Sequence, residues 1–117
     1  MKIDTGKIGE NLACSYLSKN GYKILERNFR IRGGEIDIIA LDGQTLVYVE
    51  VKTRTSYVFG MPEEAVTLKK LKFLERASKF YRLRNQNLPL LERIDVVGVD
   101  LLDFDNPKFT LIKNASF

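Results

Sequence analysis

The chain has 117 residues, of which 29% are charged and 44% hydrophobic, and its formal net charge is +4 with a pI near 9.2. This length predicts one domain, residues 1–117, and the lack of any apolar run as long as a membrane span or a signal-peptide core predicts a cytoplasmic protein with no membrane partner. The chain has no histidine and a single cysteine, Cys14. Those counts exclude a Ser-His-Asp triad, a Cys-His pair and a His-ligated zinc site, so a bound metal must be held by oxygen, which favours Mg²⁺, Mn²⁺ or Ca²⁺. The positive charge weakly favours a polyanionic partner.

The first predicted element is an amphipathic helix over residues 4–20, with Asp4 or Thr5 as N-cap and an Asn-Gly pair at its end. A small residue, Gly9, falls within the apolar stripe, which would let the helix lie close against a sheet. Glu10 falls at the margin of that stripe. The pattern alone favours an ordinary acid at the helix edge over a site residue.

A mixed first strand is predicted over residues 22–30, followed by the flexible bend Gly33-Gly34. Arg27, Arg30 and Arg32 lie close to that bend. Guanidinium groups pair well with phosphate oxygens, so phosphate contact is one interpretation. A solvated edge strand explains the arginines equally well.

Two apolar runs around Asp42-Gly43 predict an antiparallel hairpin with strands over residues 35–40 and 45–52. A loop of two residues or of four gives the same register. This register pairs Ala40 with Thr45, Asp37 with Tyr48 and Glu35 with Glu50.

Because side chains alternate along a strand, this register places Glu35, Asp37, Glu50 and Lys52 on one face. The opposite face is predicted to be core: Ile36, Ile38, Val47, Val49 and Val51. Like charges opposite each other destabilise a sheet, and partly buried carboxylates need a partner or a metal. The simpler alternative is a solvated face on which Lys52 neutralises Glu50.

A polar loop with Arg54 and Ser56 leads to a second amphipathic helix, predicted to begin at Pro62 and to end near residue 84. Lys70 lies inside its apolar arc and therefore needs a route to solvent or an acidic partner, for which the hairpin acids are candidates. Lys69 and the other lysines outside the arc form either a basic rim or an ordinary solubilising face.

The last predicted strands cover residues 93–99, a run apolar enough to be buried on both faces, and residues 108–113, an edge strand. The order is therefore helix, three strands, helix, two strands. This order predicts an α/β fold with a mixed five-stranded sheet and helices packed on it.

Several blocks of this chain resemble the YraN-type family of proposed endonucleases, which is itself similar to Holliday-junction resolvases. The matching blocks are GENLA (residues 9–13), GGEIDIIA, VYVEVKTR, the EAV segment with Lys70, and RIDVVGV. An acid on the first helix, then Asp, then Glu-x-Lys also resembles the wider PD-(D/E)xK superfamily. Ile36 stands where that superfamily label has proline. The resemblance implies a restriction-endonuclease-like fold with an αβββαβ core.

The resemblance also implies roles for individual residues. Asp37, Glu50 and Glu10 would be metal ligands, and Lys52 would lie beside the attacking water. Glu35 and Ser56 would be accessory residues. The residues expected to contact nucleic acid are Arg30, Arg32, Arg54, Lys69 and Lys70.

The implied activity is Mg²⁺- or Mn²⁺-dependent hydrolysis of phosphodiester bonds in DNA, with branched or junction DNA as one candidate substrate. Resolvases of this fold act as two-fold dimers, so a homodimer is a further expectation. Two alternatives stay open at this point. One is a nucleic-acid-binding module that keeps the nuclease fold without catalysis, and the other is a protein-interaction role in which Lys52 and Lys70 alone balance the acids.

Overall fold

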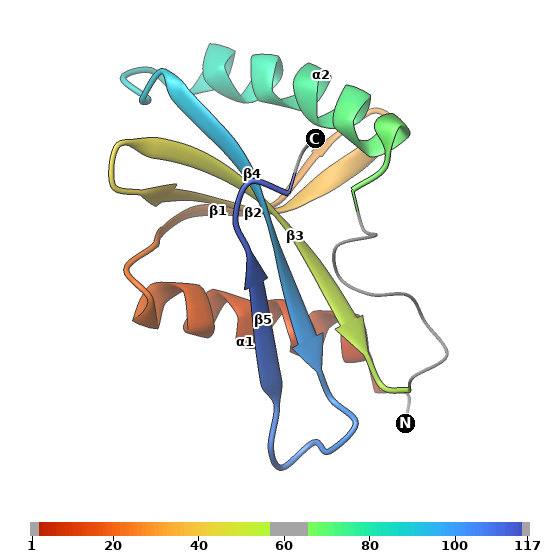
Figure 1. Ribbon diagram of the computed structural model, residues 1–117. Coiled ribbons are helices and arrows are strands. Elements are labelled where there is room, and N and C mark those ends of the chain that lie inside the picture. The colour runs from red at the N-terminus through yellow and green to blue at the C-terminus, as the bar shows by residue number, and fades with distance from the viewer. Residues whose placement is uncertain (1–2, 57–65, 116–117) are drawn as a thin grey trace.

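The computed structural model describes residues 3–56 and 66–115 (Figure 1). These residues form helices α1 (Thr5–Lys19) and α2 (Leu68–Arg84) and strands β1 (Lys23–Ile31), β2 (Gly34–Asp42), β3 (Thr45–Arg54), β4 (Leu91–Asp100) and β5 (Lys108–Ile112). The strands form one sheet in the order β1-β2-β3-β4-β5. Strands β3 and β4 are parallel, with α2 in the connection between them, and the other neighbours are antiparallel. The predicted α/β fold with a mixed five-stranded sheet is confirmed.

Helix α1 begins and ends where the sequence predicts. The Asp4 side chain accepts a hydrogen bond from the Lys7 N–H at 3.1 Å, which satisfies one of the free donors of the first turn. After Lys19 the chain turns through Gly21, whose φ of +88° suits glycine.

Helix α2 begins later than predicted. Pro62 lies outside the described residues, and Val66 and Thr67 are not helical. The helix starts at Leu68 because Thr67 is the N-cap, with its Oγ1 accepting from the Lys70 N–H at 3.1 Å. Among the described residues, no helix is long and apolar enough to cross a membrane.

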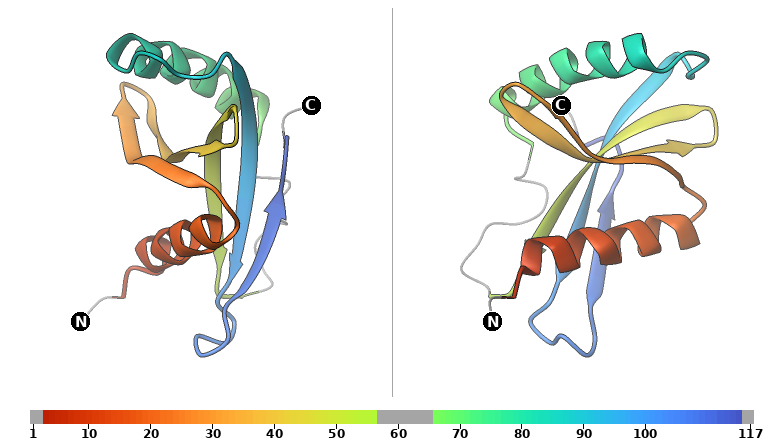
Figure 2. Two further views of the ribbon diagram at one scale, coloured as in Figure 1. Left: turned by 90° about the vertical axis from the view of Figure 1, so that its left-hand side faces the viewer. Right: turned by 180° about the vertical axis from the view of Figure 1, so that it is seen from behind.

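The helices cover opposite faces of the twisted sheet, and the β1–β2 hairpin runs between them (Figure 2). The core on the α1 side is built around Ala13, Leu17, Tyr22, Ile38, Ala40, Val47, Val49, Val97, Val99 and Leu101. The core on the α2 side is built around Phe29, Ile36, Ile39, Leu46, Tyr48, Phe73, Leu74, Ala77 and Tyr81. The sequence placed Ile36 on the same face as Ile38, which is wrong.

The register of the β2–β3 hairpin also differs from the predicted one. Thr45 pairs with Asp42 and not with Ala40, because the tight turn is Gly43-Gln44, where Gly43 adopts a φ of +59°. A shift of two residues keeps the side chains of the paired segment on their predicted faces, since the strand period is two, and Ile36 lies beyond that segment.

Strands β2 and β3 separate partway along their length. Their pairing extends from the turn to Ile38 and Val49. Beyond that point β2 follows β1 toward α2, while β3 continues with β4 toward the start of α1 (Figure 1). We call this divergence the fork. The change in direction explains why Ile36 joins the core on the α2 side.

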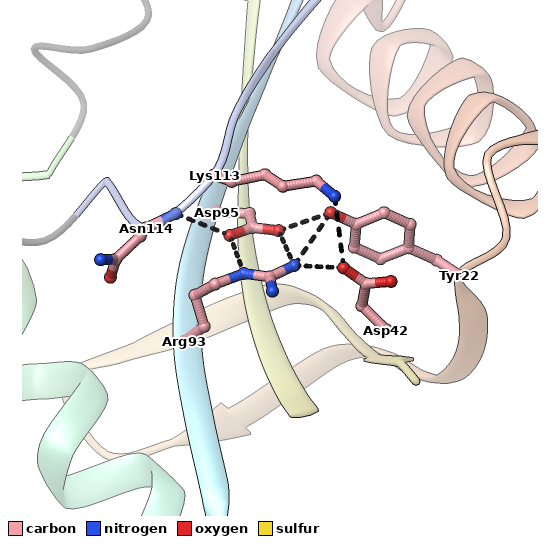
Figure 3. A network of polar contacts seen from close by, with 6 residues as sticks. All are labelled: Tyr22, Asp42, Arg93, Asp95, Lys113 and Asn114. Atoms are coloured by element: carbon pink, nitrogen blue, oxygen red, sulfur yellow. Dashed lines mark hydrogen bonds and ion pairs between the residues drawn. The ribbon is translucent and has the colours of Figure 1, made fainter. Parts of the chain in front are cut away.

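A buried polar network holds the turn end of β2 against β4 (Figure 3). The fully buried Asp95 accepts from Arg93 Nε at 2.8 Å, from the Tyr22 hydroxyl at 2.7 Å and from the Asn114 N–H at 3.0 Å. Arg93 also donates to Asp42 at 2.7 Å. The network joins the end of α1, the hairpin turn, β4 and the residues after β5.

Candidate metal centre

Three carboxylates from α1 and β2 lie together at the fork. One oxygen from each of Glu10, Glu35 and Asp37 lies within 4.8 Å of the other two. Gly9 allows α1 to approach β3, since a Cβ at this position would lie 1.8 Å from Thr53 Oγ1. That close contact places Glu10 over the sheet. All the ligand atoms are oxygens, the type that Mg²⁺ and Mn²⁺ prefer.

Asp37 is the most buried of these acids, with 9% of its surface exposed. Its Oδ2 accepts from the Val51 N–H at 2.8 Å, so the side chain bridges the two strands of the fork. Burial, and secondarily the neighbouring Glu50, raise the pKa of Asp37 to about 7, while the Val51 hydrogen bond acts in the opposite direction. A cation among the carboxylates would offset this cost of ionisation.

Glu50 is paired with Lys70 of α2. Lys70 Nζ lies 3.1 Å from Glu50 Oε2 and 3.3 Å from the carbonyl oxygen of Glu35. Burial raises the pKa of Glu50, and Lys70 only partly opposes that rise. Lys70 therefore has an acidic partner in the hairpin, as one interpretation of the sequence predicted. The simpler alternative, in which Lys52 neutralises Glu50 on a solvated face, does not describe the structure, because the ion pair of Glu50 is made by Lys70.

Asn28 is a site residue that the sequence analysis missed. It adopts a left-handed conformation within β1, with φ of +52°. Its Nδ2 donates to Glu10 Oε1 at 2.7 Å and lies 3.4 Å from Glu35 Oε1. Asparagine is among the few residues that tolerate this backbone conformation, but a lone asparagine in a strand is too weak a signal to predict it.

Glu35 also contacts Arg30. The two side chains form an ion pair, with Arg30 Nε 2.8 Å from Glu35 Oε2, although 78% of the arginine side chain is exposed. Glu35 Oε2 itself is buried and accepts no hydrogen bond of good geometry from the described residues. This oxygen therefore keeps a lone pair available for a ligand.

The comparisons with known proteins agree with the motifs. Residues 9–99 match the family described as "Uncharacterised protein family UPF0102", which confirms the YraN-type resemblance. The chain belongs to the UPF0102 family. It is 44% identical to a UPF0102 protein of Geobacter sulfurreducens, over 94% of this chain and 86% of that protein. It is also 44% identical to a UPF0102 protein of Caldicellulosiruptor saccharolyticus, over 97% and 98% of the two chains.

The UPF0102 match includes every carboxylate at the fork as well as Lys52 of the VEVKTR block. Lys52 is half-buried, lies close enough to Glu50 to lower its pKa, and lines a shallow hollow with Arg54 and Lys108. Arg54 Nη2 is 3.7 Å from Asp100 Oδ2 on the neighbouring strand. The structure therefore places Lys52 near Glu50 and Arg54 further along β3.

Three further predicted residues are described in this UPF0102 protein: Arg32 and Lys69, expected to contact nucleic acid, and Ser56, expected to be an accessory residue. Arg32 is exposed, and its carbonyl oxygen accepts from Arg76 Nη2 at 3.1 Å. Lys69 is exposed beside the Gly33-Gly34 bend, and Ser56 is half-buried just beyond β3.

Two further basic residues lie near the carboxylates: Arg27, which the sequence analysis offered as a phosphate contact, and Lys7, which it did not. Lys7 and Arg27 line a hollow at the surface together with Glu10, Asn28 and Arg30. They place positive charge next to the carboxylates of the candidate metal centre.

Proposed function

We propose that this protein is a metal-dependent nuclease that hydrolyses phosphodiester bonds in DNA. The meeting of Glu10, Glu35 and Asp37 at the fork is the observation that supports the proposal most strongly. Three carboxylates, one of them buried, form a set of hard oxygen ligands that suits Mg²⁺ or Mn²⁺. When bound, such an ion supplies positive charge that activates water and stabilises a phosphate in its transition state.

The protein's own residues take separate parts in this proposal. Asp37 and Glu10 would hold the ion, and Glu50 on β3 would be a further ligand. Glu35 would join these ligands, since one of its carboxylate oxygens lies within 4.8 Å of an oxygen of Asp37 and of Glu10. Lys52 would orient the attacking water or stabilise developing negative charge, since its position on β3 follows Glu50 on the same face.

The basic side chains around the fork would bind the phosphate backbone. Arg30, Lys7 and Arg27 lie nearest the carboxylates, in the hollow described above. The wider set predicted from sequence comprises Arg32, Arg54, Lys69 and Lys70. Branched DNA is the substrate class to test first, and both a homodimer and a cytoplasmic location remain part of the proposal.

One observation favours the second candidate, a nucleic-acid-binding module without catalysis. Lys70 forms an ion pair with Glu50, so this carboxylate has a counter-ion within the chain itself. Such a module would bind DNA in a salt-dependent manner that is indifferent to divalent ions.

Cleavage of a panel of linear, flapped and four-way DNA and RNA distinguishes the two candidates. We expect the unsubstituted protein to cleave DNA with Mg²⁺ or Mn²⁺ and not with excess EDTA. Asp37→Ala and Glu50→Ala should abolish cleavage, with circular dichroism showing an unchanged fold. Full cleavage by both variants would refute the proposed site, and DNA binding with no cleavage by any protein would support the binding module.

A further inference from the structure

Lys70 reaches the fork from a helix that lies outside the acidic motif. The Thr67 cap fixes the first turn of α2, with the Lys70 N–H donating to Thr67 Oγ1 at 3.1 Å. The side chain then extends over the Phe73 ring, with Nζ 5.5 Å from the ring centroid. Both ends of this side chain are therefore held in place.

The ammonium group of Lys70 occupies a position that is suited to a cation. It lies 3.1 Å from a Glu50 carboxylate oxygen and 3.3 Å from the Glu35 carbonyl oxygen. Only 24% of the Lys70 side chain and 19% of the Glu50 side chain are exposed. Two oxygens from two different residues thus surround a largely desolvated positive charge.

We propose that Lys70 is a positioning residue that acts as the counter-ion of Glu50 in the metal-free protein and is displaced when a divalent cation binds at the fork. The inference rests on the proposed function and adds a regulatory role for a residue on α2. Glu50 is next to Val51, whose N–H donates to Asp37 Oδ2 at 2.8 Å, so a divalent ion near Asp37 attracts the Glu50 carboxylate as well. Lys70 and the ion then compete for one carboxylate.

Once displaced from Glu50, the Lys70 ammonium group would be able to bind a different partner. An ammonium released from Glu50 remains within reach of the fork, because the first turn of α2 still fixes the backbone of Lys70 and the Phe73 ring lies beside the ammonium. A phosphate oxygen of DNA is the partner that such a group prefers. Binding of the metal would in this way make a phosphate contact available.

The test is a calorimetric titration of Mn²⁺ into the full chain and into the variants Lys70→Gln and Lys72→Gln. Removing a competing charge that lies in contact with a carboxylate typically changes an ionic equilibrium by tenfold or more. We therefore expect Lys70→Gln to bind Mn²⁺ roughly tenfold more tightly. Lys72 lies on the same helix but is exposed, so Lys72→Gln controls for the general loss of a positive charge and should bind as the unsubstituted protein does.

Equal or weaker binding of Mn²⁺ by Lys70→Gln would overturn the inference while leaving the metal site itself intact. An unsubstituted protein that binds no Mn²⁺ would overturn both the inference and the proposed function. The ¹⁵N resonance of Lys70 Nζ gives a second measurement that needs no variant. It should shift when diamagnetic Mg²⁺ is added, and an unchanged resonance in the presence of bound Mg²⁺ would contradict displacement.

Discussion

At the scale of single residues, the burial of Asp37 couples the candidate site to the stability of the protein. Its pKa of about 7 in the folded protein lies above the ordinary value of 3.8. Between these two pH values the native state keeps a proton that the unfolded state releases. The free energy of unfolding of the metal-free protein should therefore fall as pH rises from about 4 to about 7.

The variant Asp37→Asn tests this coupling. Asparagine keeps an oxygen that can accept from the Val51 N–H, but it carries no charge. In EDTA at pH 8 the variant should be more stable than the unsubstituted protein, with the advantage vanishing near pH 4. Thermal denaturation measures the difference, since a gain of about 1 kcal/mol raises Tm by roughly 5 °C in a domain of this size. Parallel pH profiles for the two proteins would contradict the burial argument.

Asn28 should increase the affinity for the metal ion, because its amide orients the carboxylates of Glu10 and Glu35. The amide is uncharged, so it does not compete with the ion for these carboxylates. The variant Asn28→Gly keeps the backbone conformation, at φ of +52°, and removes only the amide. Loss of a hydrogen bond that orients a ligand typically weakens metal binding tenfold or more, so Mn²⁺ affinity should fall by about that factor.

Asn87→Gly is the matched control for this prediction. Asn87 is exposed in the connection after α2 and has a similar φ of +64°. Its replacement should leave the Mn²⁺ titration unchanged. If both variants bound Mn²⁺ as the unsubstituted protein does, Asn28 would have no part in the site.

The side chains of the hairpin could be predicted from sequence because their alternation is local. Asp37 and Glu50 face the same region despite the wrong register, since a shift of two residues preserves the faces. The contribution of Asn28 could not be predicted in this way, and for Lys70 the sequence indicated only that its partner could be one of the hairpin acids. Both depend on how distant elements pack, and no local pattern encodes that packing.

At the scale of the elements, the approach of α1 to β3 is what brings Glu10 to the fork. A side chain at Gly9 would collide with Thr53, whose Oγ1 would lie 1.8 Å and Cγ2 2.9 Å from the new Cβ. Gly9→Ala should therefore push α1 outward, destabilise the protein by about 1–3 kcal/mol and weaken Mn²⁺ binding through the displaced Glu10. Urea denaturation and calorimetry measure the two effects.

Gly6→Ala provides the control on the same helix. Gly6 is exposed, and the nearest atom to a Cβ there is Asp4 Oδ1 at 3.4 Å. This substitution should be neutral or stabilising by up to about 1 kcal/mol, because alanine favours the helix. Adding Thr53→Ala to Gly9→Ala should recover part of the loss. No recovery in the double variant would show that the Thr53 contact is not the cause.

The boundaries of the elements show what sequence patterns leave undetermined. Strand identities could be predicted from alternating residues, but the point at which β2 leaves β3 is set by the competing pairing of β2 with β1 and of β3 with β4. The start of α2 moved from Pro62 to Leu68 because the hydroxyl of Thr67 caps the helix. From the sequence alone, Pro62 and Thr67 are both plausible residues for the start of this helix.

At the scale of the whole molecule, the network around Asp95 is predicted to support the fold independently of the metal site. It lies at the turn end of β2, and Asp95 has none of its surface exposed. Asp95→Asn would remove the buried one of the two carboxylates that pair with Arg93, so the free energy of unfolding should drop by about 3–5 kcal/mol.

Under conditions in which Asp95→Asn is still folded, its affinity for Mn²⁺ should equal that of the unsubstituted protein. Urea denaturation and calorimetry give the two values. Asp105→Asn, in the exposed turn between β4 and β5, is the control and should change neither. A loss of Mn²⁺ binding in a folded Asp95→Asn protein would show that the network and the fork are coupled.

The central claim is that the carboxylates at the fork hold a divalent ion, and anomalous diffraction from a crystal soaked in Mn²⁺ tests it most directly. We predict an anomalous peak between Glu10, Glu35 and Asp37, roughly 2.0–2.3 Å from their carboxylate oxygens, near the usual distance for a small divalent cation. A crystal without density at the fork, or with its only Mn²⁺ at an exposed acid such as Asp103, would contradict the account.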